Sequence, residues 1–484
     1  MYREGWFYTL GLLAILVVGA IYLVNIALHS WVGTDEGRLL YDAALVMQGK
    51  LPMVDIAARA PLLVYAIVLS QKVFGVSLFA GRFVSVLSVL ISAFLIYLLG
   101  KEIHGKKTGL LASFIFIFYP WIQSFLSVQT QPLQILLVLL FFILLIKGLK
   151  HNKHVLLIFA GISLGLSYLV RESSLIFIFT LPFMLYAVCK DIKLVTKEFL
   201  YVLIPLIIIV VTPSLLFNSL GAGAEGLLSG AEPMSVSTMI KGLVASMPYI
   251  TFFLLFMVPL LLTLIIEGTR RLVKDFFKPD LNMSLNYAIL LYWFGSLILF
   301  YAGYATIKKF HPGYFREFFP IFALIIAMAT IFYFKIIIKA RYRNTMMMLL
   351  LAIFGVVYMS FFTVSLSAVK AETPRYTQEA IEEVSSYIKG NTNPGDFIFC
   401  GSPIWAYMAE RNNAGFYSHP VKDYLQPIEE SFREHEVQYV IMDGKTKKIL
   451  AKSSFLTEIV SNNYQVVKDV RKGSWWNIVI LEKK

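Results

Sequence analysis

Two carboxylates, Asp35 and Glu36, stand side by side just after the first apolar segment, and a third, Asp55, follows before the next one. A carboxylate at a membrane–water interface can act as a general base that takes the proton from an attacking hydroxyl. The same pair could instead stabilise a helix that begins at Thr34, because acids in a first turn complement the helix dipole. These residues alone leave both interpretations open.

Basic residues near the ends of apolar segments are the second candidate group. Arginine offers a planar fork of donors that fits phosphate oxygens, and a charge inside a bilayer costs about 2.5–3.5 kcal/mol on insertion scales. We predict a phosphate site among Arg82, Arg171, Lys308, Lys309, His311 and Arg316. The alternatives are snorkelling for Arg82 and a local pair with Glu172 for Arg171. For Lys308 and Lys309 the alternative is attraction to lipid headgroups, and for His311 a structural hydrogen bond.

The chain that must position these residues is mostly apolar. Of its 484 residues 58% are hydrophobic and 15% are charged, whereas a soluble domain carries about 25% charged residues. Apolar runs long enough to cross a hydrocarbon core of roughly 30 Å recur from Phe7 to Val369 and then stop. They predict about eleven membrane-crossing helices, the first kept as a signal anchor, near residues 7–28, 78–99, 109–126, 131–147, 155–170, 173–189, 200–217, 248–266, 284–303, 314–334 and 345–367.

The net charge of +13 predicts an orientation rather than a nucleic-acid surface. Lys and Arg residues gather in alternate loops, which is the positive-inside pattern, so we expect a cytoplasmic N-terminus and an extracytoplasmic C-terminus in a cell membrane. The first outer loop, residues 29–77, contains a segment from Pro61 that should form an interfacial helix. The loop from Asn218 to Met247 is rich in Gly, Ser and Ala, which suits a mobile loop over a site. Cys189 and Cys400 fall on opposite sides, so neither a disulfide nor a metal cluster is expected.

The composition changes after residue 369 to that of a small globular domain. Helical spacing over 377–390, strand-like runs at 397–400 and 437–442, a helix near 447–461, and strands near 464–470 and 477–481 predict an α/β layer. The predicted fold class is therefore an α-helical polytopic membrane protein, residues 1–369, followed by a small extracytoplasmic α/β domain, residues 370–484.

The order and spacing of the loop motifs resemble a known family. The run Asp35-Glu36, Tyr41, Asp55, Pro61-Leu62 and Arg82 is similar to the opening of the GT-C glycosyltransferases, specifically the protein O-mannosyltransferase and aminoarabinose transferase superfamily (glycosyltransferase family 39-like). Later similarities lie at 161–172, at 311–320 and in NPGDFIFCG from Asn393, so the resemblance covers nearly the whole chain. Two positions depart from it: Arg59-Ala60 replaces a Lys-Pro or His-Pro, and Thr130-Gln131 stands where many members carry an acid.

This resemblance implies a membrane glycosyltransferase that moves a sugar, with inversion, from a polyprenyl-phosphate donor to an extracytoplasmic acceptor. The acceptor, with a hydroxyl or phosphate, would be a protein, a glycolipid or a cell-envelope polymer. Asp35 would be the base, with Glu36 and Asp55 shaping the site or contacting the acceptor. Substrate contacts would come from Tyr41, Arg59, Glu172 and Tyr314. No cofactor is expected, and assistance by a divalent metal stays open.

Two other functions compete with an enzyme. A transporter or flippase of lipid-linked saccharide usually shows internal repeats and charges near the membrane midplane, whereas here the charges cluster toward helix ends. A non-catalytic scaffold that assembles partners through its C-terminal domain is the third interpretation.

Overall fold

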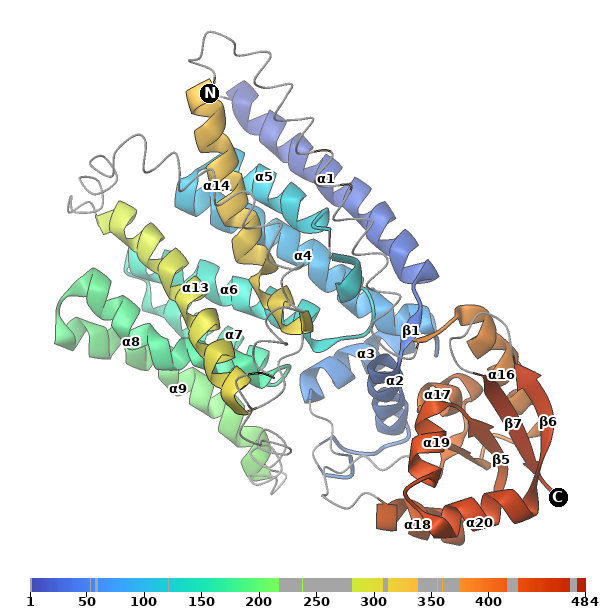
Figure 1. The fold of residues 1–484 in the computed structure, drawn as a ribbon. Coiled ribbons are helices and arrows are strands. Elements are labelled where there is room, and N and C mark those ends of the chain that lie inside the picture. The colour runs from blue at the N-terminus through green and yellow to red at the C-terminus, as the bar shows by residue number, and fades with distance from the viewer. Residues whose placement is uncertain are drawn as a thin grey trace.

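The computed structural model describes residues 2–52, 54–56, 60–120, 122–216, 237, 281–307, 312–337, 355, 359, 375–415, 425–470 and 477–484. Figure 1 shows a long bundle of helices with a smaller α/β domain at one end, next to α2 and β1. The predicted fold class, a helical membrane protein with a small C-terminal α/β domain, is confirmed by this architecture.

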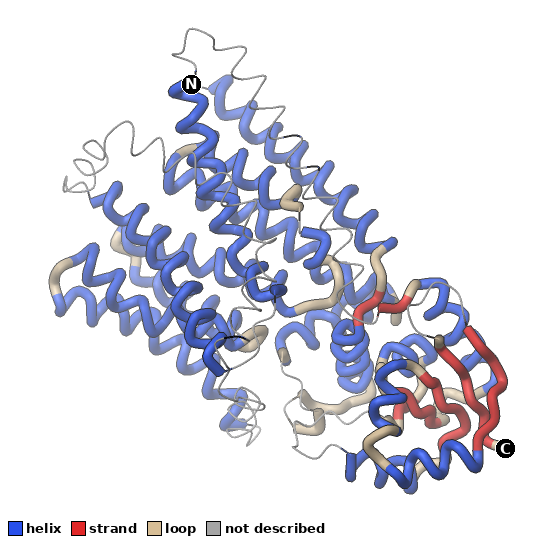
Figure 2. Tube along the Cα trace, in the orientation of Figure 1, coloured by secondary structure: helices blue, strands red, loops and turns tan. Residues whose placement is uncertain are grey.

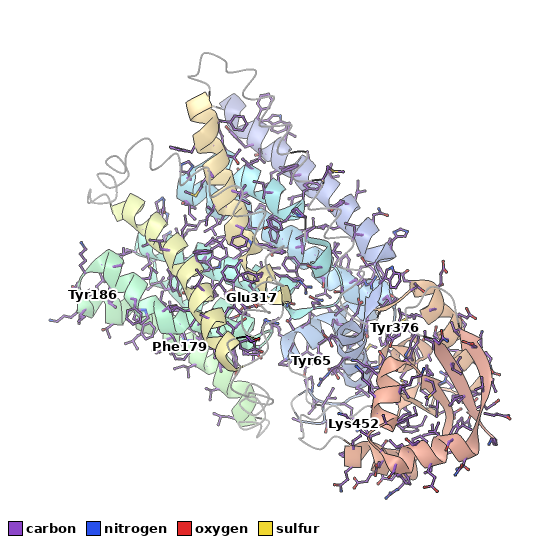
Figure 3. The ribbon with its side chains drawn as sticks, viewed as in Figure 1. Tyr65, Phe179, Tyr186, Glu317, Tyr376 and Lys452 are labelled. Carbon is purple, nitrogen blue, oxygen red and sulfur yellow. The ribbon has the colours of Figure 1, made fainter. Side chains whose placement is uncertain are left out.

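The bundle is built from nine helices among the described residues. They are α1 (Tyr2–His29), α4 (Leu78–His104), α5 (Lys106–Ile117), α6 (Thr130–His151), α7 (His154–Tyr168), α8 (Ile176–Cys189), α9 (Ile192–Leu216), α13 (Leu281–Ile307) and α14 (Phe319–Ile337). Their core is aromatic and aliphatic, with Phe142 stacked on Trp293 at a centroid distance of 4.5 Å. On the outside, Phe179 and Tyr186 of α8 are 69% and 54% exposed and project from the bundle (Figure 3). Such an apolar exterior suits contact with lipid.

The predicted number of eleven membrane crossings is not confirmed by the described residues. Within the described part of the chain, six helices are long and apolar enough to span a membrane: Trp6–His29, Leu78–His104, Thr130–His151, Glu172–Cys189, Ile192–Thr212 and Phe315–Phe332. The predicted helix 109–126 stops at Ile117 and continues as the short 3-10 helix η1 (Ile122–Phe125), because Pro120 interrupts the run. The predicted helices 248–266 and 345–367, and the loop from Asn218 to Met247, lie outside the described residues, apart from isolated positions.

The first outer loop folds into two helices. After the short strand β1 (Val32–Gly33), α2 covers Thr34–Met47 and α3 covers Pro61–Phe74. Pro61 occupies the first turn of α3, where its missing N–H costs nothing, and Gly75 ends the helix with a φ of 78°. The predicted helix from Pro61 therefore exists, and its buried face, which includes Leu63 and Ile67, packs against α2 and α4.

The C-terminal domain is a five-stranded mixed sheet with the strand order β4-β3-β5-β7-β6. Its strands are β3 (Phe397–Cys400), β4 (Asn412–Asn413), β5 (Val437–Met442), β6 (Tyr464–Val470) and β7 (Ile478–Lys483), and its helices are α16 (Gln378–Asn391), α17 (Ile404–Ala409), α18 (Leu425–Glu434), α19 (Gly444–Leu450) and α20 (Ser454–Asn463). β3 runs parallel to β4 and β5, whereas β7 is antiparallel to β5 and β6. The predicted helix 447–461 is two helices, since Ser453 caps α20 by accepting from the Leu456 amide.

The two parts meet through the first outer loop, which Figure 2 shows between them. β1 pairs with β2 (Arg375–Tyr376), and α17 packs on α2. Contact at Gly37 is so close that a Cβ there would lie 2.7 Å from Cβ of Ile404. The C-terminal domain covers the loop on one side and the bundle covers it on the other. Some charged residues of the loop are therefore buried, and others are exposed.

Candidate active site

Glu36 and Arg82 form a buried ion pair, each with a side chain 1% exposed. Nε and Nη2 of Arg82 donate to the two carboxylate oxygens at 2.7 and 2.9 Å. The remaining donors reach backbone carbonyl oxygens at and just beyond the end of α1: Nη1 to Ala27 at 2.6 Å and Ser30 at 3.0 Å, and Nη2 to Trp31 at 3.1 Å. A guanidinium has five N–H donors, and all five are engaged. In this conformation Arg82 has no donor left for a phosphate, and we revise its predicted role to that of a positioning residue.

Glu36 shares that revision. One carboxylate oxygen also accepts from the backbone N–H of Val128 at 3.1 Å. Glu36 therefore ties together the end of α1, the start of α2 and the segment before α6. Of the two alternatives predicted for it, this burial favours shaping the site over contacting an acceptor.

Asp35, in contrast, is exposed in the first turn of α2. Successive helical residues point about 100° apart, so Asp35 can face solvent while Glu36 faces the bundle. The charge of Lys445, from the C-terminal domain, interacts with that of Asp35. An exposed acid has the accessibility that a general base requires.

The other predicted residues of the first outer loop take different places. Asp55 is exposed and accepts from the Leu51 amide at 2.8 Å, which closes the turn before α3. Tyr41 is 5% exposed, and its hydroxyl accepts from the backbone N–H of Asn413 at 2.9 Å. Tyr41 thus joins the loop to the C-terminal domain, and this conformation does not present it to a substrate. Arg59 lies outside the described residues.

A second charged cluster lies inside the bundle around Glu317, which Figure 3 labels among the helices. Nε of Arg171 lies 2.7 Å from Oε1 of Glu317, and Nη1 of Arg171 donates to Oγ1 of Thr130 at 3.2 Å. Glu317 also accepts from Ser173 at 3.1 Å and from Gln134 at 3.2 Å. These residues come from the start of α6, from η2 (Glu172–Leu175) and from η3 (Pro312–Phe318).

Two sequence expectations change at this cluster. The local partner considered for Arg171 was Glu172, but Glu172 is exposed and the ion pair is with Glu317. Glu317 was missed, although an acid inside the late motif HPGYFREFFP, directly after Arg316, is a signal that could have found it. An acid between apolar helices is costly unless a cation accompanies it.

Three consecutive residues before and at the start of α6 connect all three described arginines of the predicted phosphate site. Val128 contacts Glu36, the partner of Arg82, while the side chain of Gln129 accepts from Arg316. Thr130 accepts from Arg171, at the position where an acid was noted as missing. The sequence predicted these arginines one by one, and the fold brings them to one end of the bundle.

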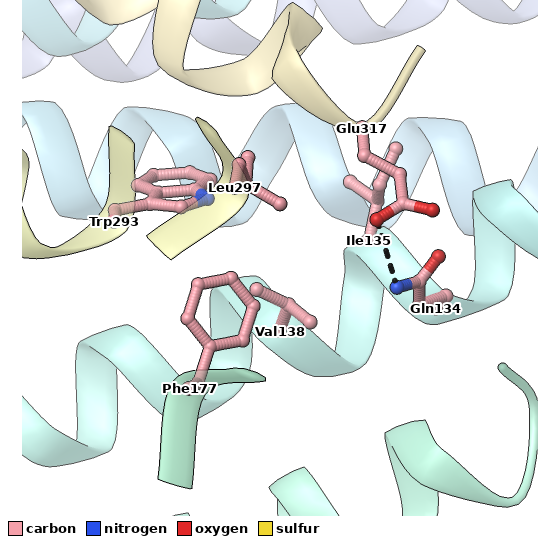
Figure 4. Close-up of a pocket in the computed structure, with 7 residues that line it drawn as sticks. All are labelled: Gln134, Ile135, Val138, Phe177, Trp293, Leu297 and Glu317. Carbon is pink, nitrogen blue, oxygen red and sulfur yellow. Dashed lines mark hydrogen bonds between the residues drawn. The ribbon is translucent and has the colours of Figure 1, made fainter. Parts of the chain in front are cut away.

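A small pocket opens beside Glu317 (Figure 4). Its lining is mainly apolar and aromatic, with a polar end where Gln134 donates to Glu317, and it consists of Gln134, Ile135, Val138, Phe177, Trp293, Leu297 and Glu317. Its volume of about 10 Å³ leaves room for about one water molecule.

Some predicted contacts are not tested by this geometry. Lys308, Lys309 and His311 lie outside the described residues, and the side chain of Tyr314, in η3, is likewise not described. Among the residues that are described, no group of three or more His, Cys, Asp or Glu side chains is placed to hold a metal ion.

Comparison with known proteins places this geometry in a family of folds. Residues 58–217 match the family model described as dolichyl-phosphate-mannose-protein mannosyltransferase. ArnT from Cupriavidus metallidurans, solved bound to undecaprenyl phosphate, is 11% identical with a TM-score of 0.61, and the match covers 99% of this chain and 98% of that one. The archaeal oligosaccharyltransferase AglB from Archaeoglobus fulgidus, in complex with an inhibitory peptide and a dolichol-phosphate, is 13% identical with a TM-score of 0.56, over 97% of this chain and 74% of that one. A search of curated protein sequences returns no match.

The family model covers the first outer loop from residue 58 through α9, and the structural match extends over the C-terminal domain as well. The resemblance predicted from the loop motifs is thereby confirmed: the chain has the fold of the GT-C membrane glycosyltransferases, of the mannosyltransferase and aminoarabinose transferase type.

Proposed function

We propose that this chain is a membrane glycosyltransferase that transfers a sugar from a polyprenyl-phosphate donor to an acceptor outside the cytoplasm. The observation that carries the proposal is the convergence of Arg171 and Arg316 on residues 129–130, directly after Val128, which donates to Glu36 of α2. A lipid phosphate needs cations for its headgroup, and arginine donors fit phosphate oxygens. The undecaprenyl phosphate and dolichol-phosphate named with ArnT and AglB are the matching chemistry in proteins of the same fold.

Asp35 acts as the general base in this proposal. The acceptor hydroxyl gives its proton to the Asp35 carboxylate while its oxygen bonds to the anomeric carbon, and the bond from that carbon to the donor phosphate breaks with its electrons on the phosphate. Arg171 and Arg316 stabilise the departing phosphate, aided by Lys308, Lys309 and His311 as predicted. A single displacement inverts the anomeric carbon. The substrate contacts predicted from the sequence remain Asp55, Arg59, Glu172 and Tyr314.

The proposed orientation keeps the N-terminus in the cytoplasm and the C-terminal domain outside. Three basic connections, 101–107, 147–154 and 190–198, join α4 to α5, α6 to α7 and α8 to α9, and they lie away from the C-terminal domain in Figure 1. Basic loops stay on the cytoplasmic side of a membrane. Asp35 and the arginine cluster would then face the outer leaflet.

Transfer by the purified full chain tests the proposal. The protein is reconstituted in lipid and incubated with radiolabelled polyprenyl-phosphate sugars and membrane extract. We expect label in an acceptor fraction with the wild type, and a loss of about 10²–10⁴-fold in Asp35→Asn, the range for a general base. Glu458→Gln, which neutralises an exposed acid on α20, is the matched control and should keep full activity.

Two results would overturn this proposal. If no donor in a panel of polyprenyl-phosphate sugars supports transfer by the folded wild type, the reaction class is wrong. If Asp35→Asn transfers as fast as the wild type, the base is wrong.

A further inference from the structure

The sheet of the C-terminal domain is buried on both faces, and only one of its two cores belongs to the domain alone. Successive side chains of a strand point to opposite faces of a sheet, so Phe399 of β3 enters one core while Ile398 and Cys400 enter the other. The core around Phe399 is closed by α18 and α20 of the same domain. The core around Ile398 is shared with the first outer loop and includes Leu40 of α2 and Leu63 of α3. One face of the sheet is thus covered with help from the membrane part of the chain.

The helix α17 lies between the two parts. Its sequence, IWAYMA, is apolar on every side, and five of its six residues are buried. A helix that is apolar all round has to be enclosed, whereas an amphipathic helix can cover a core from outside. α17 packs on β3 and α16 of its own domain and on α2 of the first outer loop (Figure 1). Separation of the domain from the loop would therefore expose an apolar face of α17 to water.

A buried hydroxyl connects α17 with the two helices that follow α2. Tyr407 is 1% exposed, and its hydroxyl accepts from Nε2 of Gln71 at 2.9 Å and donates to the backbone carbonyl oxygen of Ser77 at 3.1 Å. Gln71 lies in the last turn of α3, and Ser77 caps the start of α4 by accepting from the Ala80 amide. A phenol hydroxyl has a single proton to donate, and here that proton is used. Tyr407 therefore fixes the corner between α3 and α4 against the C-terminal domain.

The other elements of the first outer loop have hydrogen bonds of their own to the domain. Tyr41 on α2 accepts from the backbone N–H of Asn413 in β4, and β1 pairs with β2. At the end of α1, just before the loop, the carbonyl oxygen of Leu28 accepts from Nε2 of Gln378 at 2.5 Å. β1, α2 and α3 are thus each bonded to the domain or to β2, which leads into it.

The helices of the loop need this support because they are short. α2 and α3 have 14 residues each, and isolated helices shorter than about 12–15 residues are marginal in water. Most of the stability of such a helix comes from packing its apolar face, and α2 packs on α17, with Gly37 against Ile404. The orientation of α2, and with it the position of Asp35 in its first turn, therefore depends on the domain.

We propose that Tyr407 and Tyr41 are positioning residues, through which the C-terminal domain holds α2 and Asp35 in the arrangement that sugar transfer requires. This inference rests on the proposed function, because it gives the domain a part in a reaction for which Asp35 is the base. Neither tyrosine takes a proton or contacts the donor in this scheme. Tyr41, which the sequence suggested as a substrate contact, acts through the fold instead.

Two measurements on the full-length protein in lipid test the proposal. One is sugar transfer, analysed as kcat and donor KM well below the melting temperature. The other is hydrogen exchange of the α2 and α3 amides without substrate, which reports local opening of the loop. The variants are Tyr407→Phe and Tyr41→Phe, each of which removes only a hydroxyl. Tyr464→Phe is the matched control, because it removes a buried hydroxyl that donates to the Val437 carbonyl oxygen at 2.6 Å in the core around Phe399.

We expect Tyr407→Phe to speed hydrogen exchange in α2 and α3 about tenfold, because the buried amide of Gln71 loses its acceptor. kcat should fall about tenfold with little change in donor KM, since displacement of the base affects the chemical step more than donor binding. Tyr41→Phe should act in the same direction. Tyr464→Phe should lower the melting temperature but leave kcat and exchange in α2 and α3 at the wild-type values.

A rescue variant separates positioning from a chemical role of the hydroxyl. Gln71→Met combined with Tyr407→Phe replaces both polar partners by apolar side chains, which can be nearly neutral for stability. If Tyr407 only positions the loop, this double variant should recover most of kcat and return hydrogen exchange in α3 toward the wild-type rate.

The proposal is overturned if Tyr407→Phe leaves either kcat or exchange in α2 and α3 unchanged, or if Tyr464→Phe changes both by the same factor. Should Tyr407→Phe fail to accumulate, Tyr41→Phe decides by the same criteria. These failures leave the glycosyltransferase proposal intact as long as Asp35→Asn abolishes transfer. If Asp35→Asn is fully active, or the wild type transfers no sugar, the proposed function fails first, and exchange alone then shows whether the domain holds α2.

Discussion

Two arginine–glutamate pairs lie at the same end of the helix bundle, and they are built differently. Arg82 of the Glu36 pair is 1% exposed and gives three of its five hydrogen bonds to backbone carbonyl oxygens. Arg171 of the Glu317 pair is 19% exposed, and its contacts include the side chains of Glu317 and Thr130. The first arginine is buried and bonded to the backbone, whereas the second keeps part of its side chain exposed.

This difference in burial and in hydrogen-bond partners distinguishes a structural arginine from one that could bind a ligand. A guanidinium bonded to carbonyl oxygens at a helix end cannot turn to a phosphate without leaving those oxygens unsatisfied, and each costs about 1–3 kcal/mol when buried. The free-energy cost is smaller for a partly exposed guanidinium that contacts side chains, because those side chains can find other partners. We therefore expect the two pairs to respond to mutation in different measurements.

The largest effect is expected for Arg82→Gln. Glu36 would become a buried carboxylate without its cation, and losing one partner of a buried pair costs about 3–5 kcal/mol. The protein should melt at a much lower temperature in detergent or fail to accumulate. The double variant Glu36→Gln/Arg82→Gln, which removes both charges, should recover part of the loss. A folded Arg82→Gln with the melting temperature of the wild type but no donor binding would return Arg82 to the phosphate site.

The sequence could predict the elements better than their exposure. Run length and charge predicted most of the described bundle helices, and strand-like runs predicted four of the five strands of the C-terminal sheet, all but β4. Asp35 and Glu36 could not be told apart, because both lie in one helical turn and their burial depends on partners distant in the chain. Glu36 bonds to Arg82 and to Val128, whereas Asp35 stays exposed on the same turn.

Arginine pairing was hard to predict for the same physical reason. Glu317 and Arg171 are far apart in sequence, and an apolar sequence between them carries no signal of which helix ends adjoin. The sequence offered Glu172 as an alternative partner of Arg171, because it is the acid directly next to Arg171 in the chain. The break between α19 and α20 at Ser453 was hidden likewise, because a serine cap and a helix-interior serine look the same in a sequence.

A smaller but more informative effect is expected for Arg171→Gln. Loss of one phosphate contact should reduce transfer about 10²-fold, and the unpaired Glu317 should lower the melting temperature. The matched variant Arg171→Gln/Glu317→Gln removes that unpaired charge. If Arg171 serves the phosphate, the double variant regains stability and stays inactive, measured by melting temperature and by radiolabel transfer. Recovery of both would make this pair structural, like that of Glu36 and Arg82.

Asp42 on α2 is a buried acid without a close ion pair, unlike Glu36 and Glu317. Its substitution should have the smallest effect of the three. Its side chain is 1% exposed, its Oδ2 lies 4.0 Å from Nε of Arg38, and among the described residues its Oδ1 has no hydrogen-bond partner. Burial raises the pKa of Asp42 to about 6, which attraction to Arg38 only partly opposes. The folded state therefore binds more protons than the unfolded state between about pH 4 and 6, and stability falls as pH rises through that window.

Asp42→Asn should remove this contribution. At pH 7.5 we expect a net gain of about 1–2 kcal/mol, since relief of a buried charge is offset in part by an amide that also needs partners. Melting temperatures measured from pH 4.5 to 7.5 should then fall less steeply than in the wild type, while Glu458→Gln keeps the wild-type slope. An unchanged slope in Asp42→Asn would mean that Arg38 or water stabilises the charged carboxylate of Asp42 as fully as Arg82 stabilises that of Glu36. The distance to an arginine would then not predict which acid of this loop is costly to bury.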